Sequence, residues 1–447
     1  MRVPLSWLKD HIETDAPAAE IAARATALGI EVEKVEDRAK ELAPFVVGYV
    51  EEAWKHPNAD RLQLCRVNTG AATVQVVCGA PNARTGMKGV FAAPGTLIPG
   101  TGAVLKAGRI RGEDSNGMLC SEKELGLSDD HEGIIELAAD APVGSPASRA
   151  LGLEDPVLEV ALTPNRADCA GMRGIARDLA AAGLGTLKPL EAEPVQATFQ
   201  SPLRWRRDFP DGQGDACPRV VGRYFRNVKN GPSPQWLADR LRAIGLRPIS
   251  ALVDITNFVT FDLARPLHVF DADTIAGDLT MRFARAGETL GALDGRTYTL
   301  DPDMVVIADR DGVQAIGGVM GGEGSGCGED TTNVFLEVAL FDAKRIAATG
   351  RRLGIESDAR YRFERGVDPT SLAWGTRVAT RLILEICGGE ASEVVSAGEE
   401  PQWQRTATLR LSRIAGLGGV HLPPGEPARI LAALGFEVSE EEDLIRA

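Results

Sequence analysis

The sequence predicts a multidomain α+β protein with a small β-barrel inserted into its first α+β domain. The chain has 447 residues, which suggests about three or four domains at ~100–200 residues each. Hydrophobic residues make up 44% and charged residues 25% of the chain, which excludes a wholly disordered protein. A run of short strands with regular turn signals interrupts longer strand-and-helix patterns, and this interruption predicts the barrel.

Residues 1–40 predict a helix followed by a strand. Residues 18–28 are rich in alanine and end before Gly29, a common helix stop. Residues 30–35 alternate between apolar and charged side chains, as a half-buried strand does.

Residues 41–150 predict the barrel, which we interpret as an OB fold. Turns rich in Pro, Asn and Gly separate the predicted strands, which lie at residues 45–50, 62–67, 73–77 and, in shorter pieces, 95–112. OB folds bind oligonucleotides through one strand face and its loops.

Three cations of this segment, Lys106, Arg109 and Arg111, are candidate phosphate contacts. They lie close together in a chain whose net charge is 49 − 63 = −14. Such an acidic chain cannot bind nucleic acid through its overall field, so a local basic patch would be needed. Three cations are equally typical of a solvated strand.

Residues 151–190 return to the mixed pattern, with a strand predicted at 157–162 and an amphipathic helix at 174–182. Because α+β segments lie on both sides of the barrel, we expect residues 1–40 and 151–190 to form one split domain. Residues 191–216 are rich in Pro, Gln, Asp and Gly and predict a linker.

Residues 217–397 predict a larger α+β block, and residues 403–447 predict only a few further elements. These are strands at 406–411 and 436–438 and a helix at 427–434. One helix and two strands cannot bury a core, so we expect this last domain to be incomplete.

The seven cysteines contain no CxxC pair, which argues against a disulfide framework or zinc ribbon and favours a reducing cytoplasm. No stretch of 18 apolar residues is present, so we expect no membrane partner.

Several motifs occur in one order along the chain and together resemble one family. They are His56-Pro57-Asn58-Ala59-Asp60-Arg61-Leu62, Gly79-Ala80-Pro81-Asn82 and Ser115 to Gly126 in the barrel, and Ser6-Trp7-Leu8, Thr163 to Cys169, Val253 to Asn257 and Arg360 to Asp368 outside it. The barrel motifs resemble a tRNA-binding OB module. The whole chain resembles the N-terminal portion of bacterial phenylalanyl-tRNA synthetase β subunits.

The resemblance implies a function in protein synthesis. The family's enzyme attaches phenylalanine to tRNA(Phe) with ATP and Mg²⁺, and two α and two β subunits form a cytoplasmic heterotetramer. The α subunit carries aminoacylation, whereas the β subunit binds tRNA, supports assembly and hydrolyses tyrosine wrongly attached to tRNA(Phe). Residues 217–397 would be the B3/B4-type editing domain, and residues 403–447 the start of a B5-type, winged-helix-like domain.

The same resemblance implies that no residue of this chain binds ATP or Mg²⁺, because the family's metal site lies beyond Ala447. One local similarity is misleading: Arg362-Phe363-Glu364 imitates a class II synthetase signature whose arginine grips ATP. The glycine-rich motif that should follow it is missing.

The editing pocket is the candidate catalytic site. By resemblance, Thr256, Asn257 and His268 are its catalytic residues. Without the resemblance, a lone histidine is usually structural, and Thr256-Asn257 could cap a helix. Substrate-binding residues of the same pocket would be Arg247, Gly318 and Glu337.

Glu337 matches the acidic residue that recognises the tyrosine hydroxyl. A site built to hydrogen-bond a hydroxyl rejects the analogue that lacks it by ~10⁴-fold or more, which an apolar pocket cannot do. An aminoacyl ester is already activated, so positioning a water near the tRNA terminal hydroxyl can suffice for hydrolysis.

Two further segments leave alternatives open. The glycine-rich run 317–326 is either a tight turn or, by resemblance, a wall of the pocket. Residues 341–366 hold seven cations and four anions, a local excess of 7 − 4 = +3 that either guides tRNA or pairs within a helix surface. The alternative function is a non-enzymatic tRNA-binding or assembly subunit with an inactive editing pocket.

Overall fold

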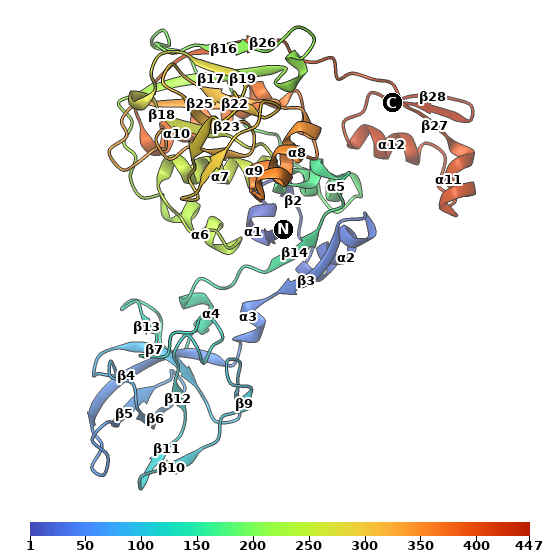
Figure 1. Cartoon of the computed structure of the whole chain (residues 1–447). Coiled ribbons are helices and arrows are strands. Elements are labelled where there is room, and N and C mark those ends of the chain that lie inside the picture. Colours follow the sequence, from blue (N-terminus) through green and yellow to red (C-terminus); the bar gives the residue numbers. More distant parts are fainter. The chain divides into compact units, whose positions relative to one another are not determined.

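The computed structural model describes residues 1–447 and divides into two compact units, residues 35–157 and residues 1–34 with 158–447 (Figure 1). None of the seven cysteines forms a disulfide. No helix combines the length and the apolar character that crossing a bilayer requires.

The smaller unit is a six-stranded antiparallel sheet that curls into a nearly closed barrel. Strand order is β12-β7-β4-β5-β6, with β13 also paired to β7. The two ends of the strand order come close together: the Asn116 backbone N–H, just before β12, donates to the carbonyl of Gln75 in β6 at 2.9 Å. The strands are β4 (Phe45–Lys55), β5 (Gln63–Asn68), β6 (Thr73–Cys78), β7 (Lys88–Ala92), β12 (Met118–Leu119) and β13 (Glu136–Leu137).

Short elements decorate this barrel. Two small strand pairs follow one another in the chain. The first consists of β8 (Leu97–Ile98) and β9 (Ala103–Val104), and the second is a hairpin of β10 (Gly108–Ile110) and β11 (Glu113–Ser115). Two single-turn helices, α3 (Arg38–Glu41) and α4 (Ala147–Ala150), flank the barrel in sequence.

The larger unit begins with a three-stranded sheet, ordered β1-β14-β3, that joins segments from both sides of the barrel in sequence. Its strands are β1 (Arg2–Pro4), β3 (Glu31–Glu36) and β14 (Val157–Ala161), and its helices are α1 (Leu5–Leu8), α2 (Ala18–Ala27) and α5 (Met172–Ala181). β2 (Ile12–Glu13) pairs with β15 (Thr186–Leu187).

Two packed sheets form the centre of the larger unit. The first, ordered β18-β25-β17-β26, consists of β17 (Arg219–Arg226), β18 (His268–Asp271), β25 (Val334–Ala339) and β26 (Glu390–Gly398). The second, ordered β16-β19-β22-β23-β24, consists of β16 (Trp205–Asp208), β19 (Leu279–Phe283), β22 (Val305–Ala308), β23 (Val313–Ile316) and β24 (Met320–Gly321). A small pair, β20 (Thr289–Gly291) with β21 (Thr297–Thr299), accompanies them.

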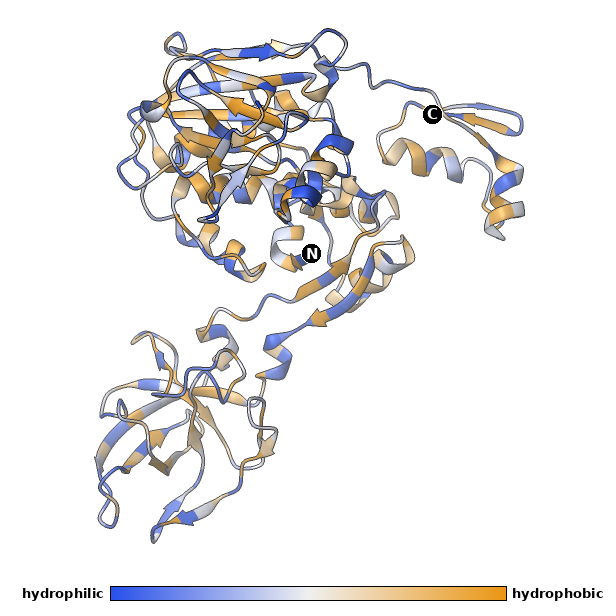
Figure 2. Cartoon of the chain, in the orientation of Figure 1, coloured by the Kyte–Doolittle hydropathy of each residue, from blue (hydrophilic) through white to orange (hydrophobic).

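Successive side chains of β25 point to opposite faces of its sheet and pack into two different cores. Phe335 and Ala339 pack between the two sheets, whereas Leu336 and Val338 pack among the helices. These helices include α6 (Gln235–Ala243), α7 (Ala251–Leu263) and α10 (Ser371–Cys387), while α8 (Ala343–Leu353) and α9 (Asp358–Phe363) follow β25 in the chain. Figure 2 shows hydrophobic colour concentrated in the strands and hydrophilic colour on α8 and α9.

The segment 191–216 is not only a linker, and that interpretation is wrong for residues 205–208. They form β16, which pairs in parallel with β19. Trp205 packs against Phe335, with ring centroids 5.3 Å apart. Gly222 makes room for it, because a Cβ there would lie 2.2 Å from the Trp205 Nε1. A short edge strand with one buried aromatic leaves little periodic signal in a polar segment.

The C-terminal residues form a three-stranded sheet, ordered β27-β29-β28, and two helices. Predicted elements overlap β27 (Thr408–Arg410) and α12 (Glu426–Ala433), but the strand expected at 436–438 is wrong because β28 begins only at Ser439. Two elements were not predicted from the sequence, α11 (Leu411–Gly418) and β29 (Leu444–Arg446). β28 itself spans Ser439–Glu441.

Candidate functional site

A cavity of about 350 Å³ opens where the two central sheets meet α7 and α9. Five of the six residues predicted for the editing pocket line it: Thr256, Asn257, His268, Gly318 and Glu337. They come from α7, β18, the turn before β24, and β25, so they are brought together only by the tertiary fold.

His268 and Glu337 form the centre of this cavity. They lie directly opposite each other in the antiparallel pair β18–β25. Residues opposite each other in such a pair share one face of the sheet, with Cβ atoms about 5 Å apart. That face also carries Phe270 and Phe335, which belong to the core between the sheets. A carboxyl and an imidazole therefore interrupt an otherwise apolar layer.

Glu337 is an unusual carboxyl group because its side chain is only 7% exposed. Burial raises its pKa to about 7, although the charge of Arg265 acts in the opposite direction. The group therefore exchanges its proton close to neutral pH. Such a perturbed carboxyl in a cavity is typical of a functional site.

His268 offers an unused polar atom. Its Nε2 is buried and has no hydrogen-bond partner, and its ring meets Phe270 edge-on at 4.5 Å between centroids. Burial lowers its pKa to about 4, so the imidazole is neutral at neutral pH. An unpaired buried nitrogen costs free energy, which a substrate or water bound there would recover.

The interior of α7 presents Thr256 and Asn257 to the cavity. The helix begins after Ser250, so these residues do not cap it, and the capping interpretation is wrong. The Thr256 hydroxyl donates to the Val253 carbonyl at 2.7 Å, which leaves its oxygen free to accept from a ligand.

Glycines of the run 317–326 form a tight turn and line the cavity, while their part in an editing pocket stays a prediction. Gly318 has φ +68°, and a Cβ there would lie 2.9 Å from the Phe341 ring. At Gly321 a Cβ would lie 2.5 Å from the His268 Cε1. Only glycine lets the backbone approach the imidazole this closely.

Arg247 does not join the cavity. It is exposed in the loop before α7, whereas the cavity is lined from Val253 onward. The helix carries Thr256 and Asn257 into the interior and leaves Arg247 outside, a separation that proximity in sequence does not reveal.

Two residues that line the cavity were not predicted from the sequence. They are Ser357 and Asp358, at the start of α9. The Ser357 hydroxyl donates to the Val319 carbonyl at 2.7 Å and thereby ties α9 to the glycine-rich wall. Ser357 also caps α9, since it accepts from the Arg360 N–H. A Ser-Asp pair before a helical pattern predicts such a cap, but not its place beside a cavity.

The cations of residues 341–366 are largely paired, which favours the ion-paired surface over a tRNA guide. Arg352 contacts Asp301 and Asp303, and both Arg360 and Arg365 contact Glu364. Arg362 is 2% exposed and donates to the Ala170 carbonyl at 3.0 Å, so it cannot grip ATP.

The three candidate tRNA contacts lie on the barrel, near or within the β10–β11 hairpin, and all are exposed. The Arg109 Nε donates to Asp114 at 2.8 Å across the hairpin. Arg111 lies in its turn with φ +55°. Exposed ion pairs contribute little to stability, so Arg109 remains available to a phosphate.

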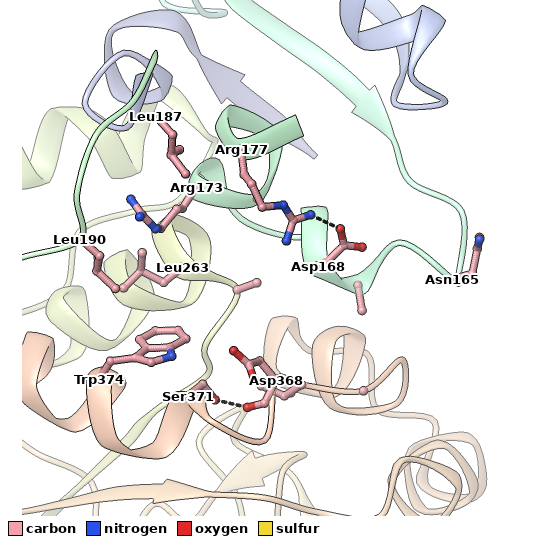
Figure 3. Close-up of a pocket in the computed structure, with 15 residues that line it drawn as sticks. Asn165, Asp168, Arg173, Arg177, Leu187, Leu190, Leu263, Asp368, Ser371 and Trp374 are labelled. Carbon is pink, nitrogen blue, oxygen red and sulfur yellow. Dashed lines mark hydrogen bonds and ion pairs between the residues drawn. The ribbon is translucent and has the colours of Figure 1, made fainter. Parts of the chain in front are cut away.

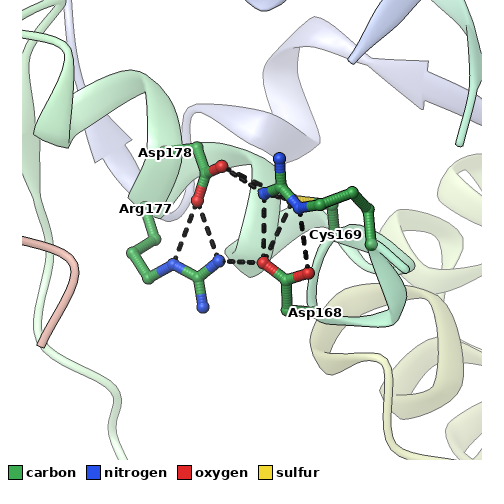
Figure 4. Close-up of polar contacts among 5 residues, drawn as sticks. Asp168, Cys169, Arg177 and Asp178 are labelled. Carbon is green, nitrogen blue, oxygen red and sulfur yellow. Dashed lines mark hydrogen bonds and ion pairs between the residues drawn. The ribbon is translucent and has the colours of Figure 1, made fainter. Parts of the chain in front are cut away.

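A second cavity of about 570 Å³ lies beside α5 and α10 (Figure 3). Trp374 and three leucines form one part of its lining, and an ion-pair network forms another. In this network Arg166 and Arg177 each contact both Asp168 and Asp178 (Figure 4).

Cys169 joins the two aspartates in a group whose ligand atoms lie within 4.8 Å of one another, a spacing that could hold a metal ion. The two guanidinium groups already neutralise these carboxylates, and burial raises the pKa of the Cys169 thiol far above neutrality. The donor set therefore fits a structural ion-pair network better than a metal.

Comparison with known proteins identifies the family. Over 442 residues, covering 99% of this chain, the sequence is 58% identical to a "Phenylalanine--tRNA ligase beta subunit" of Rhodospirillum rubrum. The chain belongs to the phenylalanine–tRNA ligase β-subunit family. The β subunit of Paramagnetospirillum magneticum is 56% identical over 443 residues and 99% of this chain. The chain spans 55% of the length of both β subunits.

Two domain models match within this β-subunit sequence. The "B3/4 domain" covers residues 216–388, and the "Putative tRNA binding domain" covers residues 45–146. The resemblance drawn from the motifs is thus confirmed, as is the multidomain α+β class in its coarse form.

A solved N-terminal fragment of the Pyrococcus horikoshii phenylalanyl-tRNA synthetase β subunit is also similar, at 16% identity. The match covers 66% of this chain and 81% of the fragment, with a TM-score of 0.32, too low to carry an argument about the fold.

Proposed function

We propose that this chain acts as the β subunit of phenylalanine–tRNA ligase and hydrolyses tyrosine wrongly attached to tRNA(Phe). The observation that carries the proposal is the pair His268–Glu337, a neutral imidazole and a buried carboxyl that face each other in a cavity. Both groups can bind a polar substituent at the end of an aromatic side chain.

In this proposal Glu337 selects the substrate. Its ionised carboxylate accepts the hydrogen bond of the tyrosine hydroxyl, while phenylalanine would leave that buried charge unpaired. A site of this kind discriminates by ~10⁴-fold or more, because the missing hydroxyl costs the full desolvation of its partner. His268 offers its free Nε2 to the same hydroxyl or to a water.

Hydrolysis needs a water placed against the ester carbonyl. Attack breaks the bond between the carbonyl carbon and the ribose oxygen, which leaves with a proton and frees the amino acid. The Asn257 amide and Thr256 oxygen, presented by α7, are suited to orient this water and the ester. Backbone groups of the wall around Gly318 complete the enclosure. Positioning is the main contribution asked of the protein, since the ester is already activated.

The remaining roles follow from membership of the family and are part of the same proposal. The barrel binds tRNA through Lys106, Arg109 and Arg111, and residues 217–397 form the editing domain. Residues 403–447 belong to a winged-helix-like domain. An α subunit supplies aminoacylation with ATP and Mg²⁺ in a cytoplasmic heterotetramer.

Release of tyrosine from tyrosyl-tRNA(Phe) tests the proposal, with phenylalanyl-tRNA(Phe) as the matched substrate. The chain is assayed both alone and with the α subunit. We expect release of tyrosine and retention of phenylalanine in the wild type, and loss of the tyrosine release when His268 and Glu337 are replaced together. Equal stability of the two esters in the assembled enzyme would instead identify a tRNA-binding or assembly subunit with an inactive pocket.

A further inference from the structure

The segment 263–268 separates two cavities. Leu263 and Ala264 line the larger one (Figure 3), and residues 266–268 line the proposed editing cavity. Arg265 lies between them, lines neither cavity and is 0% exposed. Burying a charged guanidinium costs free energy, so a fully buried Arg265 between two cavities indicates a role that offsets this cost.

Only part of this guanidinium is paired. Its Nη2 donates to the Ala339 carbonyl on β25, two residues beyond Glu337, whereas Nε and Nη1 have no hydrogen-bond partner. Its centre lies 5.6 Å from the ring centroid of Phe363, which lines the editing cavity. Gly375 on α10 admits the side chain, since a Cβ there would lie 3.1 Å from the Arg265 Cγ.

Arg265 remains charged at neutral pH. Burial lowers its pKa to about 10, and the negative charges of Glu337 and Asp368 oppose that shift. No carboxylate lies within ion-pair distance, so its field is not cancelled by a direct partner and reaches both acidic groups.

The other groups that face Glu337 do not supply a positive charge. Opposite it on β17 lies Gly222, and opposite it on β18 lies His268, which burial keeps neutral. The Cys217 thiol, before β17, is neutral because burial raises its pKa. Asp358, at the start of α9, adds negative charge to the cavity lining. Arg265 is the group whose charge lowers the pKa of Glu337.

We propose that Arg265 is a positioning residue whose buried charge, held beside β25 by its bond to the Ala339 carbonyl, favours the ionised Glu337 carboxylate that accepts from the substrate hydroxyl. The inference rests on the proposed editing function, whose specificity Arg265 sets although it does not line the cavity. Without this charge, Glu337 keeps its proton to a higher pH. A protonated carboxyl still hydrogen-bonds the hydroxyl but carries no charge that phenylalanine would leave unpaired, so tyrosine loses much of its advantage over phenylalanine.

The test compares wild type with Arg265→Met, Arg265→Gln and Arg265→Lys in the assembled enzyme. Met keeps the length without charge, Gln keeps a donor for Ala339, and Lys keeps the charge. Two readouts are taken from about pH 6 to about pH 9. This interval covers the pKa of Glu337 in the wild type and the upward shift expected without the charge. One is the ratio of tyrosine to phenylalanine release, and the other is the carboxyl infrared band of Glu337, isolated by subtracting Glu337→Gln.

We expect the midpoint of both readouts to move up by about one pH unit or more in the neutral variants. Arg265→Lys should stay close to wild type. Arg223→Gln is the matched control, since Arg223 is also buried and bonded to a carbonyl but lies opposite Leu336, on the other face of β25 from Glu337. Its midpoint should not move.

An unmoved infrared midpoint in Arg265→Met and Arg265→Gln would overturn the proposal, as would an equal shift in Arg223→Gln. If both neutral variants fail to fold, Arg265→Lys decides, because loss of the wild-type midpoint there contradicts a role based on charge. Failure of the editing function itself looks different. Wild type would then show no preference for tyrosyl-tRNA(Phe), while the infrared titration would still report the effect of Arg265.

Discussion

Glu337 and His268 have exchanged the usual order of their pKa values. The carboxyl titrates near 7 and the imidazole near 4, both because burial disfavours their charged forms. Between these values both side chains are neutral, and above about 7 the cavity acquires one negative charge. The Glu337–His268 pair is therefore uncharged in mild acid and becomes a stronger hydrogen-bond acceptor as the pH rises.

This inversion predicts how stability depends on pH in Glu337→Gln. Folded Glu337 keeps its proton up to about pH 7, whereas its unperturbed value is 4.5. The folded state binds more protons over this interval, so this group weakens folding as pH rises through it. Glutamine removes the effect, and the variant should gain stability relative to wild type by up to roughly 3 kcal/mol between about pH 4.5 and 7.

Urea denaturation of both proteins at several pH values measures this difference. His268 has the opposite effect, since its stabilising contribution grows as pH rises from about 4 to 6.5, but it is present in both proteins and cancels. Glu329→Gln, at an exposed position, should show no such trend. A difference that stays constant with pH would contradict a buried, protonated Glu337.

The sequence predicted these residues through a family resemblance and not through their geometry. Nothing local brings Glu337 opposite His268, because the register of β18 and β25 is set by pairing between distant segments. Arg247 shows the converse: it is close in sequence to Thr256 but lies outside the cavity.

At the scale of elements, β24 holds the histidine ring in place through its one glycine, Gly321. Gly321→Ala should place a methyl group against the imidazole and displace it, lowering tyrosine release by on the order of 10²-fold. Gly324→Ala is the control, since nothing lies within 4 Å of a Cβ there. Single-turnover deacylation of tyrosyl-tRNA(Phe) measures the effect. Equal rates in the two variants would show that the ring position does not matter.

The β10–β11 region predicts how tRNA binding responds to salt. Replacing Lys106, Arg109 and Arg111 with alanine should weaken binding and lower the slope of log affinity against log salt by about 2, if each neutralises one phosphate. Arg84→Ala removes an exposed cation that lies between β6 and β7, outside the β10–β11 region, and should leave the slope unchanged. Filter binding of tRNA(Phe) at several salt concentrations measures both. An unaltered slope in the triple variant would exclude phosphate contacts here.

Elements with a clear period or clear stop signals were predictable, and edge elements were not. α2 ends before Gly29, where the sequence placed its stop. By contrast, β16 shows a single buried tryptophan followed by one exposed and one half-buried arginine, and α11 buries none of its residues. Where little apolar surface is buried, the sequence carries little periodic signal.

At the scale of the whole molecule, the barrel is an insertion whose ends return to one sheet. The chain leaves for the barrel after β3 and comes back at β14, and these strands are neighbours in the order β1-β14-β3. Replacing residues 37–155 by a tight turn such as Asn-Gly should therefore leave the rest of the larger unit folded. Circular dichroism and retained tyrosine release would confirm this result. An insoluble or unfolded product would show that the barrel is needed for the core to form.

The arrangement of β3 and β14 also bears on the history of the protein. A module bounded by two adjacent strands can be gained or lost in a single genetic event, because neither step breaks a hydrogen-bonded ladder. Selection can then act on the barrel and on the cavity separately. A chain without the barrel would keep every residue that lines the cavity of about 350 Å³, because all of them lie between Val253 and Phe363.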